Sequence, residues 1–238
     1  MGQAYNSQPV ALDHHNFPLH KVVDMAFFLG SAVCHQLPQH SLQPGGHPLP
    51  LCGRCTGIHF GLWMGFYSLL VLMRRKLGIV PNWKVATVMV VSFALMAGDV
   101  FSGALGWQPG FNETRLATGL LVGYSLALLM GPVLAGINRD EATKSRLGWR
   151  DLGLGVFLVA CLWPLLFYAP GWMFYPLVIF EGLSVIGTYA VVWGVLIAYI
   201  TFAARNKPVP WWLWVGGGIV ISIIQAVLMG TLRIRLGI

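Results

Sequence analysis

Long apolar runs are the feature of this sequence that most constrains its fold. A helix needs about 20 mostly apolar residues to cross the hydrocarbon core of a bilayer. Five runs meet this length, and a sixth is slightly short and contains a proline. The five are Thr56 to Met73, Val85 to Ala104, Leu116 to Ile137, Leu177 to Ala203 and Trp211 to Leu232, and the sixth is Leu152 to Tyr168. We therefore predict an all-α integral membrane protein.

The helix count depends on the segment before these runs. Lys21 to Cys34 has a shorter apolar core, which Asp24 interrupts. It is either a short span or a helix lying in the interface, and we favour the span. The prediction is a bundle of about seven transmembrane helices, with six as the alternative. We expect a polar N-terminal tail over residues 1–20 and one transmembrane domain over 21–238, with a motif-bearing half at 33–123. No cleavable signal peptide is expected.

Composition supports lipid as the main solvent of this chain. Hydrophobic residues make up 56% of it and charged residues only 10%, whereas soluble domains carry about 25% charged residues. The net charge of +7 is compatible with nucleic-acid binding, but the basic residues form short clusters between apolar runs. Membrane topology explains such clusters better. We expect the lipid bilayer, and no nucleic acid, as a partner.

The distribution of Lys and Arg near the helix ends predicts the orientation. Three alternate connections are basic, which places them in the cytoplasm. They contain Arg74, Arg75, Lys76 and Lys84, then Arg139, Lys144, Arg146 and Arg150, then Arg205 and Lys207. The loops His35 to Leu51, Gly106 to Thr114 and Ala169 to Tyr175 then face outward. Arg233 and Arg235, at the outward C-terminus, are the exceptions.

Thiols and imidazoles gather near the outer end of the first two helices. All seven histidines lie in the first 59 residues, and three of the four cysteines lie within 22 residues. Cys52 and Cys55 form a C-x-x-C pair at a helix start, and His59 falls on the same face. Cys34 and His35 end the preceding helix, and a short loop returns the chain to the same depth. The sequence therefore predicts one cluster at the outer leaflet.

Three chemistries fit this cluster. Zinc favours four N or S ligands in a tetrahedron, which Cys34, Cys52, Cys55 and one histidine would supply. Alternatively, a C-x-x-C pair at a helix N-terminus suits redox exchange, because the helix dipole makes Cys52 nucleophilic. An outward face is also oxidising, so a structural disulfide remains open. We favour the metal, and for the fourth ligand we favour His35; the other candidates are His47, His40 and His59.

Charged side chains inside lipid are costly, so each is a functional hypothesis. Asp99 lies in the outer half of its helix, and Glu181 lies near the outer third of a later one. Asn112 and Arg115 stand at the start of the helix that follows Asp99. A buried Asp99–Arg115 pair is one interpretation. In the other, Asn112 and Arg115 bind a substrate phosphate or carboxylate, and Asp99 and Arg115 are the candidate catalytic residues, with Asp24 as an alternative general base.

Three glycines repeat at every fourth position of one predicted helix, namely Gly57, Gly61 and Gly65. Small residues let membrane helices approach closely. We interpret these glycines as a packing surface.

The same residues resemble a widespread prokaryotic family of small predicted membrane proteins, catalogued as a domain of unknown function. The similar positions are Cys34-His35, Pro38, Ser41, Pro50, Cys52, Arg54, Cys55, Gly57, Gly61, Gly98-Asp99, Asn112, Arg115 and Gly119. The resemblance covers roughly Val33 to Gly123. His40 stands where the family pattern has Arg, and His59 where it has Tyr. The resemblance implies a location in the plasma membrane of a prokaryote and supplies no activity.

Three functions are consistent with these features. The favoured one is a site for a divalent metal, with zinc as the favoured ion, that acts on or moves a small or lipid-linked substrate at the outer leaflet. The second is thiol-disulfide redox chemistry, with Cys52 attacking and Cys55 or Cys34 resolving. The third is a non-catalytic accessory subunit of a larger electron-transport complex, with other membrane subunits as partners. Whether the protein is an enzyme stays open at this stage.

Overall fold

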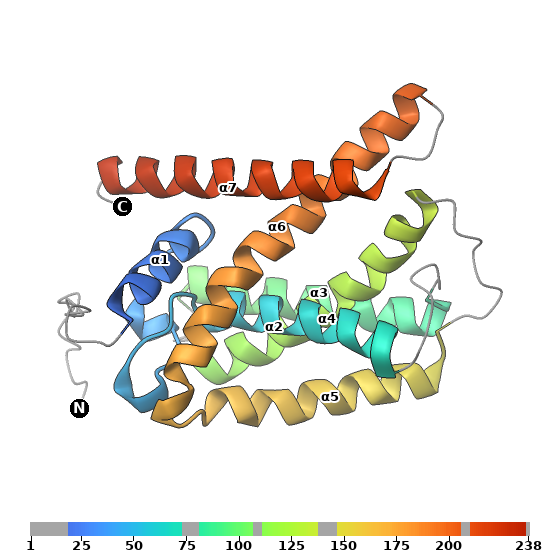
Figure 1. Cartoon of the computed structure of the whole chain (residues 1–238). Coiled ribbons are helices and arrows are strands. Elements are labelled where there is room, and N and C mark those ends of the chain that lie inside the picture. The colour runs from blue at the N-terminus through green and yellow to red at the C-terminus, as the bar shows by residue number, and fades with distance from the viewer. Residues whose placement is uncertain (1–18, 73–80, 107–110, 138–146, 206–209, 237–238) are drawn as a thin grey trace.

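A computed structural model describes residues 19–72, 81–106, 111–137, 147–205 and 210–236 (Figure 1). Within these ranges the chain forms seven α-helices, which confirms the all-α class. They are α1 (His20–Ser31), α2 (Gly53–Tyr67), α3 (Trp83–Ala104), α4 (Asn112–Ile137), α5 (Trp149–Phe167), α6 (Phe174–Arg205) and α7 (Trp211–Leu236). Short 3-10 turns η2 (Pro38–His40), η3 (Pro44–Gly46) and η5 (Gly171–Met173) lie between helices, and the π-helical turn η4 (Ser68–Leu72) extends α2.

Four of the described helices are long and apolar enough to cross a membrane. These segments are Trp83–Gly103, Trp149–Phe167, Gly171–Thr201 and Trp212–Arg233. Their surfaces carry exposed large apolar side chains such as Val90 and Leu183, as expected of helices in contact with lipid. Helix α1 has 12 residues and is about 18 Å long at 1.5 Å per residue. It is therefore shorter than the hydrocarbon core of about 30 Å.

Helices α2 and α4 form the centre of the fold. Their mutual packing is the most extensive helix–helix contact in the described part of the chain. Helix α6 runs obliquely past α2 and packs against α1 and α7, while α3 and α5 pack against α4 (Figure 1). The loop between α1 and α2 lies at the same end of the molecule as the start of α6 (Figure 1). This arrangement brings α1, α2, α4 and α6 together around the candidate site.

The close approach of α2 and α4 depends on glycines from both helices. A Cβ atom on Gly57 would lie 2.6 Å from the carbonyl oxygen of Leu116, and one on Gly119 would lie 3.1 Å from the Cα of Gly57. Gly61 and Gly123 face the partner backbone in the same way. The predicted packing role of the glycine repeat is confirmed, and α4 contributes glycines that complete it.

Several predictions fall outside the described residues. They concern residues 1–18 of the expected N-terminal tail and most of the basic residues that predict the orientation, namely Arg74, Arg75, Lys76, Arg139, Lys144, Arg146 and Lys207. The orientation therefore stays a prediction.

Candidate metal centre

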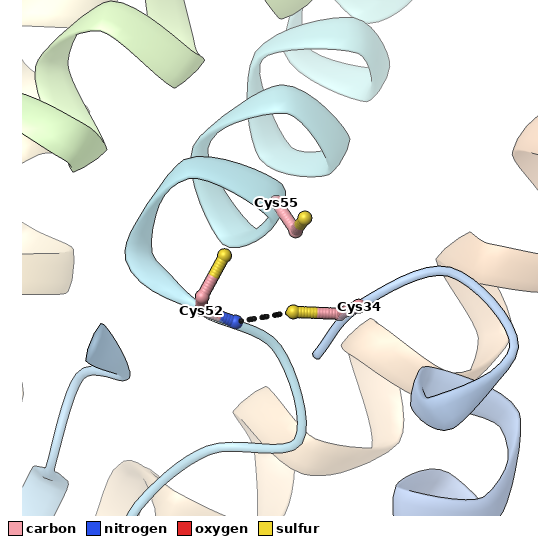
Figure 2. Close-up of side chains that lie close together, drawn as sticks. All are labelled: Cys34, Cys52 and Cys55. Carbon is pink, nitrogen blue, oxygen red and sulfur yellow. Dashed lines mark hydrogen bonds between the residues drawn. The ribbon is translucent and has the colours of Figure 1, made fainter. Parts of the chain in front are cut away.

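Three thiols converge at the first turn of α2. Figure 2 shows Cys52 and Cys55 at the start of that helix and Cys34 facing them from the segment after α1. The three Sγ atoms lie within 4.8 Å of one another, Cys34 and Cys52 are buried, and all three carry free thiols. The backbone N–H of Cys52 donates to the Sγ of Cys34 at 3.2 Å. The structure therefore brings together the three cysteines that sequence analysis grouped.

The turn after Cys34 is held by Gln36. Its φ of 53° lies in the left-handed region, which non-glycine residues adopt at a cost that the surroundings must offset. The Nε2 of Gln36 donates to the carbonyl oxygens of Phe27 at 2.8 Å and Pro50 at 2.9 Å. One side chain thereby connects α1 to the segment that leads into Cys52. This connection keeps Cys34 beside the C-x-x-C pair.

A buried carboxylate from α6 holds the other side of the same junction. Glu181 is 0% exposed. Its Oε2 accepts the backbone N–H of Leu51 at 3.0 Å, and its Oε1 accepts the hydroxyl of Thr56 at 2.6 Å. Leu51 and Thr56 flank the two cysteines of the pair. Glu181 was predictable from the sequence as an intramembrane charge, but these partners were not.

Arg233 of α7 binds the end of α1. Its Nη1 donates to the carbonyl oxygen of Ser31 at 2.9 Å and also to that of Cys34. The terminal carbonyl oxygens of a helix have no hydrogen-bond donor within the helix. Arg233 supplies such a donor at the end of α1. Arg233 was an exception to the predicted charge distribution. Its place in the structure gives it a role in positioning Cys34.

The three thiols differ in acidity because they share hydrogen bonds. Donation from the thiols of Cys34 and then Cys55 lowers the pKa of Cys52. The pKa of Cys34 is raised, chiefly by its hydrogen bond to Cys52, and the pKa of Cys55 is raised by its hydrogen bonds to Cys34 and Cys52. Negative charge therefore collects on Cys52, at the N-terminus of α2, where the helix dipole favours it.

The histidines do not join the three thiols. Within the described ranges, the group able to hold a metal consists of the three cysteines alone. His35 is exposed, and its Nε2 lies 3.2 Å from the Nδ1 of His40. The buried His59 pairs with the Oγ1 of Thr188 at 3.0 Å, and the ring of His47 lies 5.5 Å from that of Phe174. In this structure, therefore, none of these histidines lies in place to act as the fourth ligand.

Asp99 forms its ion pair with a residue of the C-x-R-C motif. Its Oδ2 lies 2.6 Å from the Nε of Arg54, and its Oδ1 accepts the Thr114 hydroxyl at 3.3 Å. The ion-pair partner of Asp99 is therefore Arg54, and not Arg115 as one interpretation of the sequence predicted. The position of Arg54 between Cys52 and Cys55 was the sequence signal that could have indicated a role for Arg54 at the site. Asp24, the alternative base, is exposed on α1.

Arg115 and Asn112 lie at the start of α4, beside this ion pair. Arg115 is 7% exposed, and its Nε and Nη1 have no hydrogen-bond partner among the described residues. The Nδ2 of Asn112 donates to the carbonyl oxygens of Gln39 at 3.1 Å and Ser41 at 3.3 Å, while its Oδ1 is buried and unpartnered there. Burial, followed by the nearby charge of Arg54, lowers the pKa of the Arg115 guanidinium.

Comparison with known proteins places these residues in a wider group. A family model described as "Predicted membrane protein (DUF2085)" matches residues 34–129. An uncharacterized protein of Methanocaldococcus jannaschii is 30% identical over 104 residues, which cover 43% of this chain and 64%, just under two thirds, of that protein. An uncharacterized protein of Methanothermobacter thermautotrophicus is 31% identical over 100 residues, 41% of this chain and 83% of that protein. No solved structure matches the chain.

Proposed function

The chain belongs to the DUF2085 family of predicted membrane proteins, and we propose that its Cys34, Cys52 and Cys55 bind one zinc ion. The matched segment begins at Cys34 and includes the whole thiol cluster. We further propose that the site faces outward from the plasma membrane of a prokaryote, in a bundle of seven membrane-embedded helices. There the metal site acts on or moves a small or lipid-linked substrate.

The proximity of three thiols carries this proposal. In a tetrahedral site with Zn–S bonds of about 2.3 Å, sulfurs lie about 3.8 Å apart, which small side-chain rotations reach from the separations of less than 4.8 Å. Thiolates select zinc over magnesium or calcium. The backbone N–H of Cys52 donates a hydrogen bond to the Sγ of Cys34. Hydrogen bonds of this kind orient metal ligands. His35 is the proposed fourth ligand, because it follows Cys34 in the chain and acts electrostatically on Cys52.

The polar residues beside the cluster are the proposed substrate side of the site. Asp99, held by Arg54, is the proposed general base, and Asn112 and Arg115 are the proposed substrate-binding residues. Bound zinc would supply a Lewis acid for a substrate oxygen that takes the place of the histidine ligand. The N-terminus of α4, which carries Asn112 and Arg115, is a region where anions bind favourably.

Metal content tests the proposal directly. Protein purified without chelator is expected to contain about one zinc per chain, because three thiolates and one histidine supply a high-affinity set of zinc ligands. Elemental analysis measures the metal, and mass spectrometry of the unreduced protein measures the redox state of the thiols. Zinc below roughly 0.2 per chain, together with an oxidised Cys52–Cys55 pair, would reject the metal and support the redox alternative.

The free C-x-x-C pair at a helix start favours that alternative. Cys52 would attack a substrate disulfide as thiolate, and Cys55 would displace the mixed disulfide, so that the substrate is reduced and the pair oxidised. The same mass spectrometry decides between the two functions, because a thiol pair held by zinc stays reduced and protected from alkylation until a chelator is added.

Orientation is tested at Gln43, which is exposed in the loop between α1 and α2. We expect Gln43→Cys, on a Cys161→Ser background, to react with a membrane-impermeant maleimide in intact cells. Cys161 is replaced because it is exposed on α5. As a matched control, Arg150→Cys on the predicted cytoplasmic side should react only after lysis. The reverse pattern of labelling would place the site in the cytoplasm.

A further inference from the structure

The guanidinium of Arg115 is buried and forms no ion pair with the described residues. The carboxylate of Asp99 is already engaged by Arg54 at 2.6 Å and by the Thr114 hydroxyl at 3.3 Å. Arg115 is 93% buried, yet its Nε and Nη1 meet no acceptor among the described residues. Burying a charged group without a partner is costly. A ligand that accepts from these two N–H groups would remove that cost.

An unpaired acceptor stands one helical turn away. The Nδ2 of Asn112 is fixed by the carbonyl oxygens of Gln39 and Ser41, and this leaves its buried Oδ1 without a donor among the described residues. Residues three apart on a helix are neighbours on one face, so Asn112 and Arg115 share a face of α4. The ligand that satisfies both presents an anionic acceptor to Arg115 and a hydroxyl or N–H donor to Asn112.

The site is built where α4 meets the first turn of α2. A Cβ atom on Gly53 would lie 3.6 Å from the Cβ of Arg115 and 3.5 Å from the carbonyl oxygen of Asn112. The starts of the two helices therefore lie in van der Waals contact at this point. Cys52 lies close enough to act electrostatically on Arg115. A ligand on Arg115 is therefore adjacent to the thiol cluster.

We propose that Arg115 and Asn112 bind the headgroup of an anionic glycerophospholipid, with the phosphodiester on Arg115 and a headgroup hydroxyl on the Oδ1 of Asn112. This inference names the substrate class of the proposed metal site and rests on that proposal for the role of the lipid, although the binding does not require metal. A phosphodiester carries a single negative charge, which matches the single positive charge of the Arg115 guanidinium. A phosphomonoester carries about −1.5 to −2 and would leave an excess.

The surroundings favour lipid as the source of the phosphate. Large apolar side chains on the elements that carry the site are exposed, with Phe101 67% and Phe111 55% accessible. Phe101 follows Asp99 on α3, and Phe111 immediately precedes α4. Acyl chains can cover such side chains while the headgroup reaches the α4 start, where the helix dipole favours a phosphate.

Titration of short-chain lipids into the purified protein tests the inference. Dioctanoyl phosphatidylglycerol is added to protein in a neutral detergent, with dioctanoyl phosphatidylcholine and inorganic phosphate as comparison ligands, and binding is followed by native mass spectrometry and thermal stabilisation. We expect phosphatidylglycerol to bind, and Arg115→Gln to weaken it by about tenfold or more, as for loss of a charge-assisted contact. Arg115→Lys keeps the charge and should recover only part of the affinity. Arg150→Gln, an exposed arginine at the start of α5, should bind as the wild type does.

The outcomes separate this inference from the proposed metal function. Equal binding of phosphatidylglycerol by wild type, Arg115→Gln and Arg115→Lys would overturn the inference, as would equal affinity for the zwitterionic phosphatidylcholine. Inorganic phosphate binding as tightly as phosphatidylglycerol, through Arg115, would support the oxyanion site and identify free phosphate as its ligand. Zinc is measured in the same samples. A zinc-free wild type that still binds phosphatidylglycerol through Arg115 would reject the metal function alone.

Discussion

Cys52→Ser is expected to abolish zinc binding and to leave a protein that unfolds at a lower temperature. Cys52 shares hydrogen bonds with both other thiols of the cluster, and these lower its pKa. Serine is a poor ligand for zinc, and outer-shell changes alone weaken metal binding by about 10–100-fold, so loss of a direct ligand should exceed about 100-fold. Metal binding also contributes folding free energy.

Cys161→Ser is the matched control for this prediction. Cys161 is exposed on α5, so its replacement should change neither the zinc content nor the melting temperature. Elemental analysis and thermal unfolding in detergent, with and without added zinc, measure both quantities. A Cys52→Ser protein with a full equivalent of zinc would exclude Cys52 as a ligand. Equal melting temperatures of wild type with and without zinc would show that the cluster does not stabilise the fold.

Glu181→Leu is expected to cause the second large effect, a loss of stability accompanied by weaker metal binding. The substitution leaves the N–H of Leu51 without an acceptor and leaves the hydroxyl of Thr56 only its longer contact, at 3.4 Å, with the carbonyl oxygen of Leu51. A buried polar group left unsatisfied costs about 1–3 kcal/mol, so we expect a loss of at least this size. Because these two residues flank Cys52 and Cys55, their release should also disturb the thiol geometry. Thermal unfolding and zinc affinity are the measurements.

Two further variants make the Glu181 prediction specific. Glu181→Gln keeps one oxygen and the side-chain size, so it should lose about half as much stability as Glu181→Leu. Glu113→Gln, at an exposed glutamate in the first turn of α4, should be close to neutral. If Glu181→Leu were as stable as wild type, the carboxylate would not be holding the junction. If it lost stability but kept full zinc affinity, its role would be limited to the fold.

Much of the fold could be predicted from the sequence because the determining features are local. The length of an apolar run and the position of its flanking polar residues indicate a membrane helix, and α3, α5, α6 and α7 follow the predicted runs. The repeat of Gly57, Gly61 and Gly65 predicted a packing face because helical periodicity puts these residues on one side. The thiol cluster was also predictable, since the C-x-x-C spacing and a short loop join its members.

The partners across the site were decided only by the tertiary structure. Arg54 and Arg115 were both available to Asp99, and the rotation of α2 and α4 about their glycine contact gives the carboxylate to Arg54. Cys34 and His35 are adjacent in the sequence, yet Cys34 is buried and His35 is exposed. The left-handed turn at Gln36 comes directly after them.

Glu181 lies 130 residues after the Leu51 whose N–H it accepts. A sequence pattern predicts which residues share a face of one helix, but it describes each helix separately. Which polar groups meet depends instead on helix rotation, crossing angle and loop conformation, and these follow from packing among elements far apart in the chain. The membrane class and the grouping of the three thiols therefore followed from local sequence patterns. The tertiary structure decided which side chains orient those thiols and which, like Arg115, remain available to a ligand.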